Sequence, residues 1–363
     1  MKHIFHVITS LDLGGAERVA INLSKSENKS LKFHLVEVVR GNSDFTSKLI
    51  EEINQEHIFI HRGLPFGRKV SILLFPLVFI FRYIRWRPVI IHTHTEIPDL
   101  SIFLFFRMFS LFRLSAKLVR TLHNTELWNK WGKLGARVEP FYKKRATIVS
   151  ISLSVSRNYT KEYGTFDMPL IFNGVEEVKQ CAFEGIDKTK INILFAGRLN
   201  YQKGINQLIQ VVSNFVGDKR FDFYIIGAGE ESEKLKKVFS AAPNVKLRAK
   251  IYNLAIYLHS FDYVFLPSNF EGLALLPIEA SLAKTPCIIN SCPGLKDTLP
   301  YDWPLKVHNN SVEDFISIFE SLPYRTDREF LALEAYRYAK EYFSIENMQK
   351  HYEELYKQII THG

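Results

Sequence analysis

Short apolar runs alternate with segments of helical periodicity along the whole chain, and this alternation limits the fold more than any other feature. Strands that are apolar along their whole length are buried on both faces, which is typical of parallel sheets covered by helices. Five such runs lie in each half, at residues 3–8, 33–39, 89–92, 117–121, 147–150, 192–196, 222–226, 245–247, 263–266 and 286–289. We therefore expect an α/β protein with two Rossmann-like, doubly wound domains.

The boundary between the two domains is predicted from turn chemistry. Asn173-Gly174 is followed by a charged, polar stretch that ends near Lys190, and such a stretch is typical of a domain linker. We expect residues 1–172 to form an N-terminal domain and residues 173–345 a C-terminal domain. Residues 346–363 should form a helix that packs back on the first domain, with apolar residues at helical spacing: Met348, Tyr352, Leu355, Tyr356 and Ile359.

The net charge of +9 is concentrated in the first half of the chain. Residues 1–175 carry 25 Lys and Arg against 14 Asp and Glu. An excess of this kind suits nucleic acid, an anionic membrane surface or a phosphorylated substrate, and composition does not choose among them. No acidic residue lies between Glu56 and Glu96, and residues 71–84 are almost wholly apolar. This run is shorter than the ~20 residues of a membrane span, so it is either a buried helix or a helix lying on a bilayer.

The cysteine content and the first residues bear on the compartment. The three cysteines form no Cys-x-x-Cys pair and no Cys/His cluster in the sequence, so we expect a reducing compartment and no metal site. The first apolar stretch contains His3 and His6 and is followed by charged residues instead of a cleavage site. We interpret it as the first strand of a cytoplasmic protein.

Two predicted strand ends in the first half carry groups that can bind a ligand. Gly14-Gly15 lies between the first strand and a helical segment, where glycines allow close backbone approach and helix amides attract anions, although a tight packing turn would have the same pattern. His123 follows a later strand, and His92 and His94 occupy a comparable strand end. Open α/β sheets bind ligands at such carboxyl ends.

Cations and carboxylates follow two strands of the second half. Gly197-Arg198 ends one strand and Lys203 precedes the next helix, which places a forked guanidinium and a point charge where a pyrophosphate could bind. After the strand at 263–266, Glu271 is expected in a loop and Glu279 in the first turn of a helix. Between these carboxylates, the backbone amides of Leu275 and Leu276 could bind phosphate, a combination that suits a nucleotide sugar.

These segments, in this order and spacing, resemble family 4 of the retaining glycosyltransferases, which have the GT-B fold of two Rossmann-like domains facing a central cleft. The resemblance covers nearly the whole chain and is carried by Gly14-Gly15-Ala16-Glu17, Thr121-Leu122-His123-Asn124, Val149-Ser150 with Ser152, Phe172-Asn173-Gly174-Val175, Gly197-Arg198 with Lys203-Gly204, Gly227-Ala228-Gly229-Glu230, and Glu271 with Glu279. The family pattern usually has Phe-Gly where this chain has Leu273-Ala274, so the donor is left open.

The resemblance implies a role for each matched position. It implies catalytic roles for His123, Arg198, Lys203 and Glu271, and donor binding by Gly14, Gly15, Asn173, Gly197, Leu275, Leu276 and Glu279. In that scheme the first domain lies on the acceptor side and the second binds the nucleotide sugar. Arg198 and Lys203 neutralise the nucleotide diphosphate and Glu279 holds the ribose. Glu271 holds the donor sugar, to which His123 forms a hydrogen bond. No metal is implied, and no cofactor beyond a UDP- or GDP-linked sugar that serves as substrate.

The expected activity is therefore transfer of a sugar, with retention of configuration, to a hydroxyl of a glycan or lipid-linked glycan acceptor during bacterial surface polysaccharide biosynthesis. The basic first half predicts peripheral contact with the anionic inner face of the cell membrane. A sugar-nucleotide epimerase of the same architecture is the alternative enzyme. A basic RNA-binding protein is a further alternative, but the sequence has no RNP-like aromatic motif, KH loop or basic helix, and we expect no nucleic acid partner.

Overall fold

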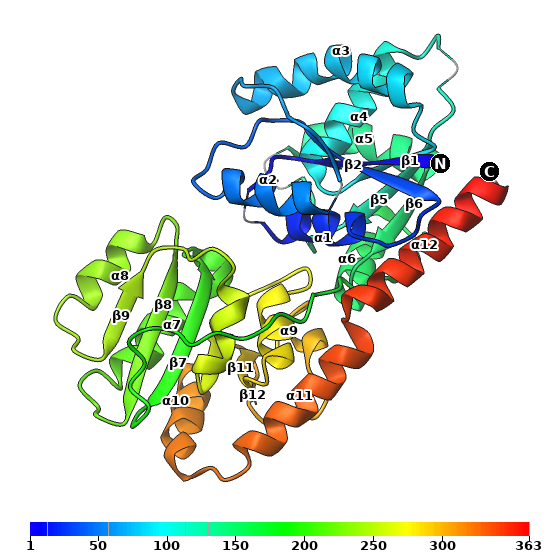
Figure 1. The fold of residues 1–363 in the computed structure, drawn as a ribbon. Coiled ribbons are helices and arrows are strands. Elements are labelled where there is room, and N and C mark those ends of the chain that lie inside the picture. The colour runs from blue at the N-terminus through cyan, green and yellow to red at the C-terminus, as the bar shows by residue number, and fades with distance from the viewer. Residues whose placement is uncertain (13, 57, 113, 129–130, 363) are drawn as a thin grey trace. The chain divides into compact units, whose positions relative to one another are not determined.

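The computed structural model describes residues 1–12, 14–56, 58–112, 114–128 and 131–362 and contains two six-stranded parallel sheets (Figure 1). The chain divides into an N-terminal unit, residues 1–174 with 345–363, and a C-terminal unit, residues 175–344. These boundaries lie one or two residues from those expected from the sequence. The α/β class with two doubly wound sheets is confirmed.

The sheet of the N-terminal unit has the strand order β3-β2-β1-β4-β5-β6. Its strands are β1 (Lys2–Ile8), β2 (Leu31–Glu37), β3 (Phe59–His61), β4 (Ile90–Thr93), β5 (Lys117–Leu122) and β6 (Ala146–Ser150). Its helices are α1 (Gly15–Ser24), α2 (Thr46–Gln55), α3 (Arg68–Trp86), α4 (Glu96–Met108), α5 (Gly132–Arg145), α6 (Leu153–Tyr163) and α12 (Ile345–His362). The order reverses between β1 and β4, which makes this pair the switch point of the sheet.

The C-terminal unit repeats the same topology, with the strand order β12-β11-β10-β7-β8-β9. Its strands are β7 (Ile191–Arg198), β8 (Phe221–Ala228), β9 (Val245–Arg248), β10 (Tyr263–Leu266), β11 (Cys287–Asn290) and β12 (Lys306–Val307). Its α-helices are α7 (Ile205–Ser213), α8 (Ser232–Val238), α9 (Leu275–Leu282), α10 (Val312–Ser321) and α11 (Arg328–Tyr342), and its 3-10 helices are η1 (Tyr201–Lys203), η2 (Leu254–Ser260), η3 (Lys296–Thr298) and η4 (Leu322–Tyr324). Here the order reverses between β7 and β10.

Two strands were missed by the sequence analysis, and both lie at a sheet edge. β3 has three residues and β12 has two, which is too short for a periodic pattern to be seen. The ten predicted strands are all present, with ends shifted by one or two residues.

The terminal helix α12 joins the N-terminal unit through the residues that the spacing singled out. Met348, Tyr352 and Tyr356 are each at most 2% exposed. The hydroxyls of Tyr352 and Tyr356 also form hydrogen bonds with Thr121 and His92 of the sheet, each at 2.7 Å. The helix thus packs on the sheet, and its tyrosine hydroxyls form hydrogen bonds with polar side chains of the strands.

The apolar run at 71–84 lies within α3, which buries only one of its faces. Ile72, Phe75 and Phe79 are in the core, whereas Leu73 and Phe81 are 64% and 74% exposed. No helix among the described residues combines the length and the hydropathy that crossing a bilayer would require.

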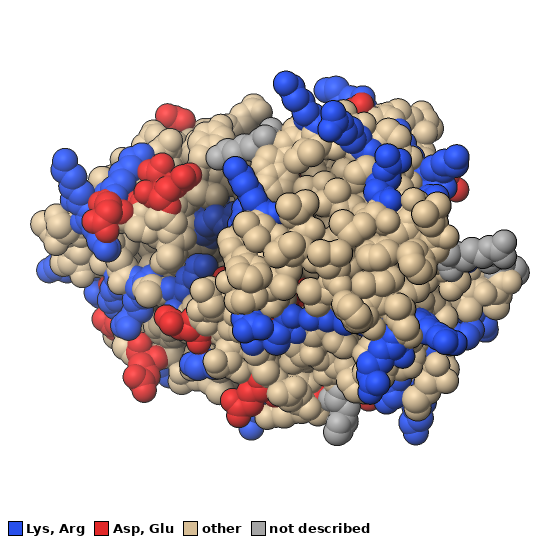
Figure 2. Space-filling model, turned by 90° about the horizontal axis from the view of Figure 1, so that it is seen from above, with Lys and Arg blue, Asp and Glu red and all other residues tan. Residues whose placement is uncertain are grey.

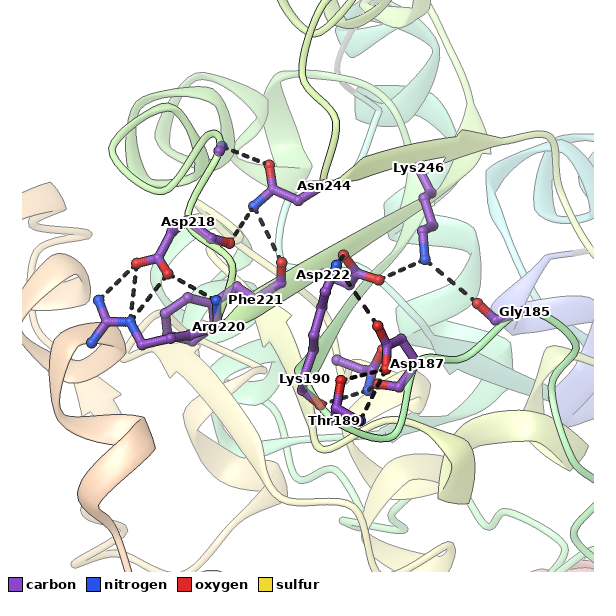
Figure 3. Close-up of polar contacts among 12 residues, drawn as sticks. Gly185, Asp187, Thr189, Lys190, Asp218, Arg220, Phe221, Asp222, Asn244 and Lys246 are labelled. Atoms are coloured by element: carbon purple, nitrogen blue, oxygen red, sulfur yellow. Dashed lines mark hydrogen bonds and ion pairs between the residues drawn. The ribbon is translucent and has the colours of Figure 1, made fainter.

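Charges at the amino ends of β7 and β8 are paired with one another and brace the C-terminal unit (Figure 3). The carboxylate of Asp222, which is 2% exposed, lies 3.0 Å from Lys190 Nζ and 2.6 Å from Lys246 Nζ. The Asn244 side-chain amide donates to the carbonyl of Phe221 at 3.2 Å. These contacts hold the loops at the amino edge of the sheet in place, so we assign them a structural role.

Candidate active site

The switch point of the C-terminal sheet brings together the strongest group of predicted site residues. β7 pairs with β10 on one side and with β8 on the other. β7 ends at Gly197-Arg198, and the loop after β10 carries Glu271. Because parallel strands end at the same edge, these groups share the carboxyl edge, where α/β folds bind ligands.

An ion pair joins the two sides of this switch point. Lys203 Nζ lies 2.6 Å from Glu271 Oε1, and the Glu271 side chain is only 8% exposed. Gln202 Nε2 donates to the other carboxylate oxygen at 3.4 Å and to the Phe270 carbonyl at 3.2 Å. The carboxylate is thus held by a cation and an amide, while the ammonium of Lys203 remains part-exposed.

Two glycines make this approach of loop to strand sterically feasible. Gly204 has φ of 68°, and a Cβ added there would lie 1.7 Å from the Pro267 carbonyl oxygen. Gly294 has φ of 75°, and its Cβ would lie 2.3 Å from the Glu271 carbonyl oxygen. Side chains are excluded at both positions by conformation and by space, so the Lys203 and Glu271 segments depend on them.

Arg198 supplies a second cation at the same edge. Its side chain is exposed, and no ion pair to it is found among the residues that the structure describes. Asn200 accepts the backbone N–H of Lys203 at 3.3 Å and so caps the short helix η1 that follows. Arg198 and Lys203 therefore lie five residues apart on either side of a fixed turn.

Helix α9 begins at the same edge, with its first amides directed away from the helix body. Leu275 and Leu276 are its first two residues, and Ala274 at the cap position offers no side-chain acceptor. The sequence analysis placed Glu279 in the first turn, and this is wrong: Glu279 is the fifth helical residue, and the first turn holds no acid. The helix begins two residues before Pro277, and this start is compatible with the proline because the N–H of the third helical residue has no partner within the helix.

The remaining predicted residues belong to the N-terminal unit. Gly14 is the cap of α1 and Gly15 its first residue, so this pair follows β1 at the switch point of that sheet. Asn173 is 3% exposed, and its side-chain oxygen has no hydrogen-bond partner among the described residues.

His123 follows β5 and is part of a histidine array that single residues of the sequence did not reveal. His6 and His92 are register partners on β1 and β4. His6 Nδ1 lies 2.8 Å from His94 Nε2, and His94 Nδ1 lies 3.2 Å from His123 Nε2. Burial lowers the pKa of His6 and of His123 to about 3, and that of His94 falls well below its usual value. The array is therefore uncharged at neutral pH.

The same histidines include a group that the sequence analysis did not identify and whose geometry could hold a metal ion. His6, His92 and His94 offer nitrogens within 4.8 Å of one another. Those of His92 are already bonded to Tyr356 and Thr121, each at 2.7 Å, and His6 and His94 bond each other. An ion would have to replace these hydrogen bonds, so we propose no metal here.

A buried glutamate that the sequence analysis did not select, Glu37 at the end of β2, holds the neighbouring loops of the N-terminal unit. The Glu37 carboxylate accepts the backbone N–H groups of Leu11 at 2.6 Å, Gly41 at 2.9 Å and Gly63 at 3.0 Å, and it pairs with Arg62 Nε at 2.6 Å. The sequence did contain a signal for this residue, since Glu37 is a single acid at the end of a largely apolar strand. Its role is to position the loop after β1.

Family models match both halves of the chain. Residues 13–178 match the model described as Glycosyltransferase Family 4, and residues 179–316 match the model described as Glycosyl transferases group 1. This chain belongs to the glycosyltransferases that these two models describe. The two models meet at residues 178 and 179, close to the boundary between the units.

Curated relatives of the glycosyltransferase include a protein of a cps region and an enzyme of O-antigen biosynthesis. An uncharacterized 41.2 kDa protein in the cps region of Klebsiella pneumoniae is 24% identical over 311 residues, which are 73% of this chain and 82% of that protein. The O-antigen biosynthesis glycosyltransferase WbnH of Escherichia coli is 29% identical over 194 residues, 52% of each chain. The match thus spans only about half of the length of that relative.

Solved structures confirm the fold. The crystal structure of Anabaena Alr3699/HepE in complex with UDP-glucose gives a TM-score of 0.81 over 99% of this chain and 100% of that chain, at 16% identity. Agreement over both units shows that the glycosyltransferase has the GT-B pair of Rossmann-like domains.

Proposed function

We propose that this glycosyltransferase moves a sugar from a UDP- or GDP-sugar to a hydroxyl of a glycan or lipid-linked glycan acceptor, with retention of anomeric configuration. The observation that carries the proposal is the Lys203–Glu271 ion pair, 2.6 Å long, at the switch point where Arg198 is also exposed. Cations beside a fixed carboxylate suit a ligand that has both a diphosphate and sugar hydroxyls.

In this proposal Arg198 and Lys203 stabilise the leaving group. The bond between the anomeric carbon and the diphosphate oxygen breaks, negative charge develops on that oxygen, and fixed cations lower its energy in the transition state. The amides of Leu275 and Leu276 at the start of α9 add donors for the same phosphates. These groups are enough to bind the donor without a metal or another cofactor.

The contacts of Glu271 support retention of the anomeric configuration. Its two oxygens already meet Lys203 and Gln202, which suits a group that orients the donor sugar better than a free base. If the acceptor hydroxyl attacks on the face from which the diphosphate leaves, the phosphate oxygen can take the acceptor proton. Such a reaction needs no protein base and keeps the configuration.

The relatives support the proposed substrates. HepE is seen with UDP-glucose, which favours a uridine donor here. WbnH acts in O-antigen biosynthesis and the Klebsiella protein lies in a cps region, so a growing surface polysaccharide is the proposed acceptor. We infer that the enzyme works in the cytoplasm, where nucleotide sugars are present.

The test is a product assay with a panel of UDP- and GDP-sugars, with and without acceptor. We expect transfer only when an acceptor is present, and an anomeric coupling constant in the product that matches the donor. Arg198→Ala and Lys203→Ala should each lower kcat by roughly 10²- to 10³-fold, the loss typical of one electrostatic donor. Lys236→Ala removes an exposed cation of α8 and is the matched control.

Wild-type turnover in both Arg198→Ala and Lys203→Ala, at saturating and at limiting donor, would contradict the assignment of the cations. An altered sugar nucleotide formed without acceptor would identify an epimerase instead. A product with inverted anomeric configuration would contradict the retaining mechanism but not the assignment as a glycosyltransferase.

We further propose that one face of the N-terminal unit binds an anionic lipid surface. The exposed face of α3 carries apolar side chains at helical spacing, Val70, Leu73, Leu77, Phe81 and Ile84, and the chain after α4 exposes Leu111 by 97%. Figure 2, viewed from the side on which α3 lies in Figure 1, shows a broad uncharged surface bordered by Lys and Arg. Apolar insertion with a cationic border is the combination that peripheral binding needs.

The membrane proposal is tested by sedimentation with vesicles of varied anionic lipid content. We expect binding that rises with anionic lipid and falls in the triple variant Leu73→Gln, Leu77→Gln, Phe81→Gln and in the triple variant Arg68→Glu, Lys69→Glu, Arg85→Glu. Arg82 is left unchanged because it donates to the Arg62 carbonyl at 2.8 Å. Val238→Gln, an exposed apolar residue of the other unit, is the control.

Absence of vesicle binding at low salt, or binding that both triple variants retain, would overturn the membrane proposal. Dimerisation through α3, seen as a mass change that the apolar triple variant abolishes, would assign the surface to a second copy of the chain.

A further inference from the structure

The histidine array of the N-terminal unit has an order that can be followed atom by atom. It runs from His6 on β1 through His94, just after β4, to His123, just after β5, with nitrogen-to-nitrogen distances of 2.8 and 3.2 Å. His6 and His94 are fully buried, and His123 is part-exposed at the end of the array. The array thus leads from the core to the residue assigned to the donor sugar.

Every member of the array is neutral near pH 7. Burial is the first cause that lowers the pKa of His6, His94 and His123. A neutral imidazole carries one N–H and one lone pair. Each hydrogen bond of the array therefore requires one ring to donate and the next to accept, and only two arrangements of the three protons satisfy both bonds.

The buried end of the array decides between these arrangements. Nε2 of His6 is buried and has no hydrogen-bond partner among the described residues. In one arrangement it is an N–H without an acceptor, and in the other it is a lone pair without a donor. A buried N–H without an acceptor is the rarer of the two states in folded proteins, so the proton of His6 resides on Nδ1.

That choice fixes the rest of the array. His6 Nδ1–H donates to His94 Nε2, so His94 is protonated at Nδ1 and donates to His123 Nε2. His123 must then be protonated at Nδ1. No hydrogen bond to this atom is found among the described residues, so its N–H is the group that His123 can offer to a ligand.

We propose that His94 is a positioning residue that, together with His6, holds His123 in the tautomer protonated at Nδ1, so that His123 offers an N–H donor to a hydroxyl of the donor sugar. The contact with the sugar rests on the proposed function. The tautomer does not, because it follows from the array alone. The same array fixes the ring orientation of His123, since its Nε2 is held by His94.

The first experiment needs no substrate. Two-bond ¹H–¹⁵N correlation spectra of the full chain, labelled with ¹⁵N-histidine, distinguish protonated Nδ1 from protonated Nε2. The His123 resonances are assigned by their loss in His123→Phe. We expect protonation at Nδ1 at pH 7.5. A His123 ring protonated at Nε2 would overturn the proposal whatever the enzyme does.

Two variants of His94 separate donation from packing. The amide nitrogen of Asn lies as many bonds from the backbone as Nδ1 of His, so His94→Asn can still donate to His123, whereas His94→Leu cannot. We expect His94→Leu to shift His123 to a tautomer mixture and to lower kcat/KM for the donor sugar roughly 3- to 10-fold, the effect of one neutral hydrogen bond. Affinity for the free nucleotide should be unchanged, and His94→Asn should restore both readouts.

The outcomes distinguish this inference from the proposed function. If His123 has the expected tautomer and His94→Leu changes that tautomer but not turnover, the positioning role of His94 is supported and the contact between His123 and the sugar is contradicted. If His94→Asn behaves like His94→Leu, the role of His94 is packing and the positioning role is overturned. A rise in melting temperature on adding zinc, lost in His6→Asn, would assign the histidines to a metal and overturn the array.

Discussion

Mild acid should unfold the N-terminal unit while the C-terminal unit remains folded. Burial lowers the pKa of His6, His34 and His123 to about 3, whereas an unfolded histidine has a pKa near 6.5. The folded-state pKa lies below the unfolded one, so the stability linked to each group is complete above pH 6.5. It is lost as the pH falls from there towards the folded-state pKa.

The expected size follows from counting protons. Between about pH 5.5 and 4.5 these three histidines are neutral in the folded state and charged in the unfolded state. His92 and His94, whose pKa values are also lowered by burial, act in the same direction, and so does His61, whose pKa burial lowers to about 4.

Asp99 acts against this uptake. Burial raises its pKa to about 7, so the folded state holds a proton that the unfolded state releases. The net uptake on unfolding is about five protons, or about 7 kcal/mol of stability per pH unit at ~1.36 kcal/mol per proton. A domain stability of about 5–15 kcal/mol would be exhausted within about three pH units below 6.5.

The assay is urea unfolding at a series of pH values from 7.5 to 4.5, followed by tryptophan fluorescence. Trp303 is the tryptophan of the C-terminal unit, so Trp303→Phe leaves only signals from the N-terminal unit. His34→Asn should reduce the slope by about one proton, or about 1.4 kcal/mol per pH unit. His259 and His308 of the C-terminal unit are exposed, so the transition of that unit, obtained from the protein that retains Trp303, is the reference.

A slope of one proton or less in the N-terminal transition would refute the reasoning. So would a His34→Asn variant with the slope of the wild type. Either result would mean that these imidazoles are charged in the folded protein or that water reaches them.

Three further outcomes test the C-terminal unit. Gly204→Ala should destabilise it by several kcal/mol and displace Lys203, because its Cβ would lie 1.7 Å from the Pro267 carbonyl oxygen, whereas Gly217→Ala, also at positive φ but in open space, should cost only about 1 kcal/mol; equal melting temperatures would disprove the steric argument. Glu279→Gln should weaken free-nucleotide binding and Glu271→Gln should mainly lower turnover, as calorimetry and kinetics would show; unchanged nucleotide affinity in Glu279→Gln would reject the ribose role. Asp222→Asn should destabilise the fold by about 1–3 kcal/mol in urea unfolding, because Lys190 and Lys246 lose their buried carboxylate, with little effect on turnover; a large loss of activity in the folded variant would show that this cluster is not merely structural.

The strands and the two units were predictable because a strand buried on both faces is a continuous apolar run in the sequence. An apolar run such as residues 263–266 reads as a strand without knowledge of its neighbours. The edge strands β3 and β12 leave no such record. Their pairing depends on the preceding strand and not on their own composition.

The candidate site was predictable only where its chemistry is local in sequence. Glu271 and Lys203 stood out at strand ends, but the distance between them depends on the β7–β10 pairing and on Gly204 and Gly294. The histidine array joins residues 29 and 88 positions apart. No spacing rule anticipates such contacts, because register between strands creates them.

The departure from the family pattern at Leu273-Ala274 can be explained by the backbone. Ala274 has φ of −70° and ψ of 126°, a conformation open to any residue, and its methyl group lies in the C-terminal core. Alanine is therefore the better fit here, and Ala274→Gly should destabilise this unit by about 1–2 kcal/mol through the lost methyl burial and the added unfolded-state entropy. The Ala274 amide should still donate to the Gly294 carbonyl, as it does at 3.2 Å, so the loop and the transfer reaction should survive. A more stable Ala274→Gly variant in urea unfolding would mean that the loop is strained at this position and that its alanine is tolerated for the sake of the sugar pocket.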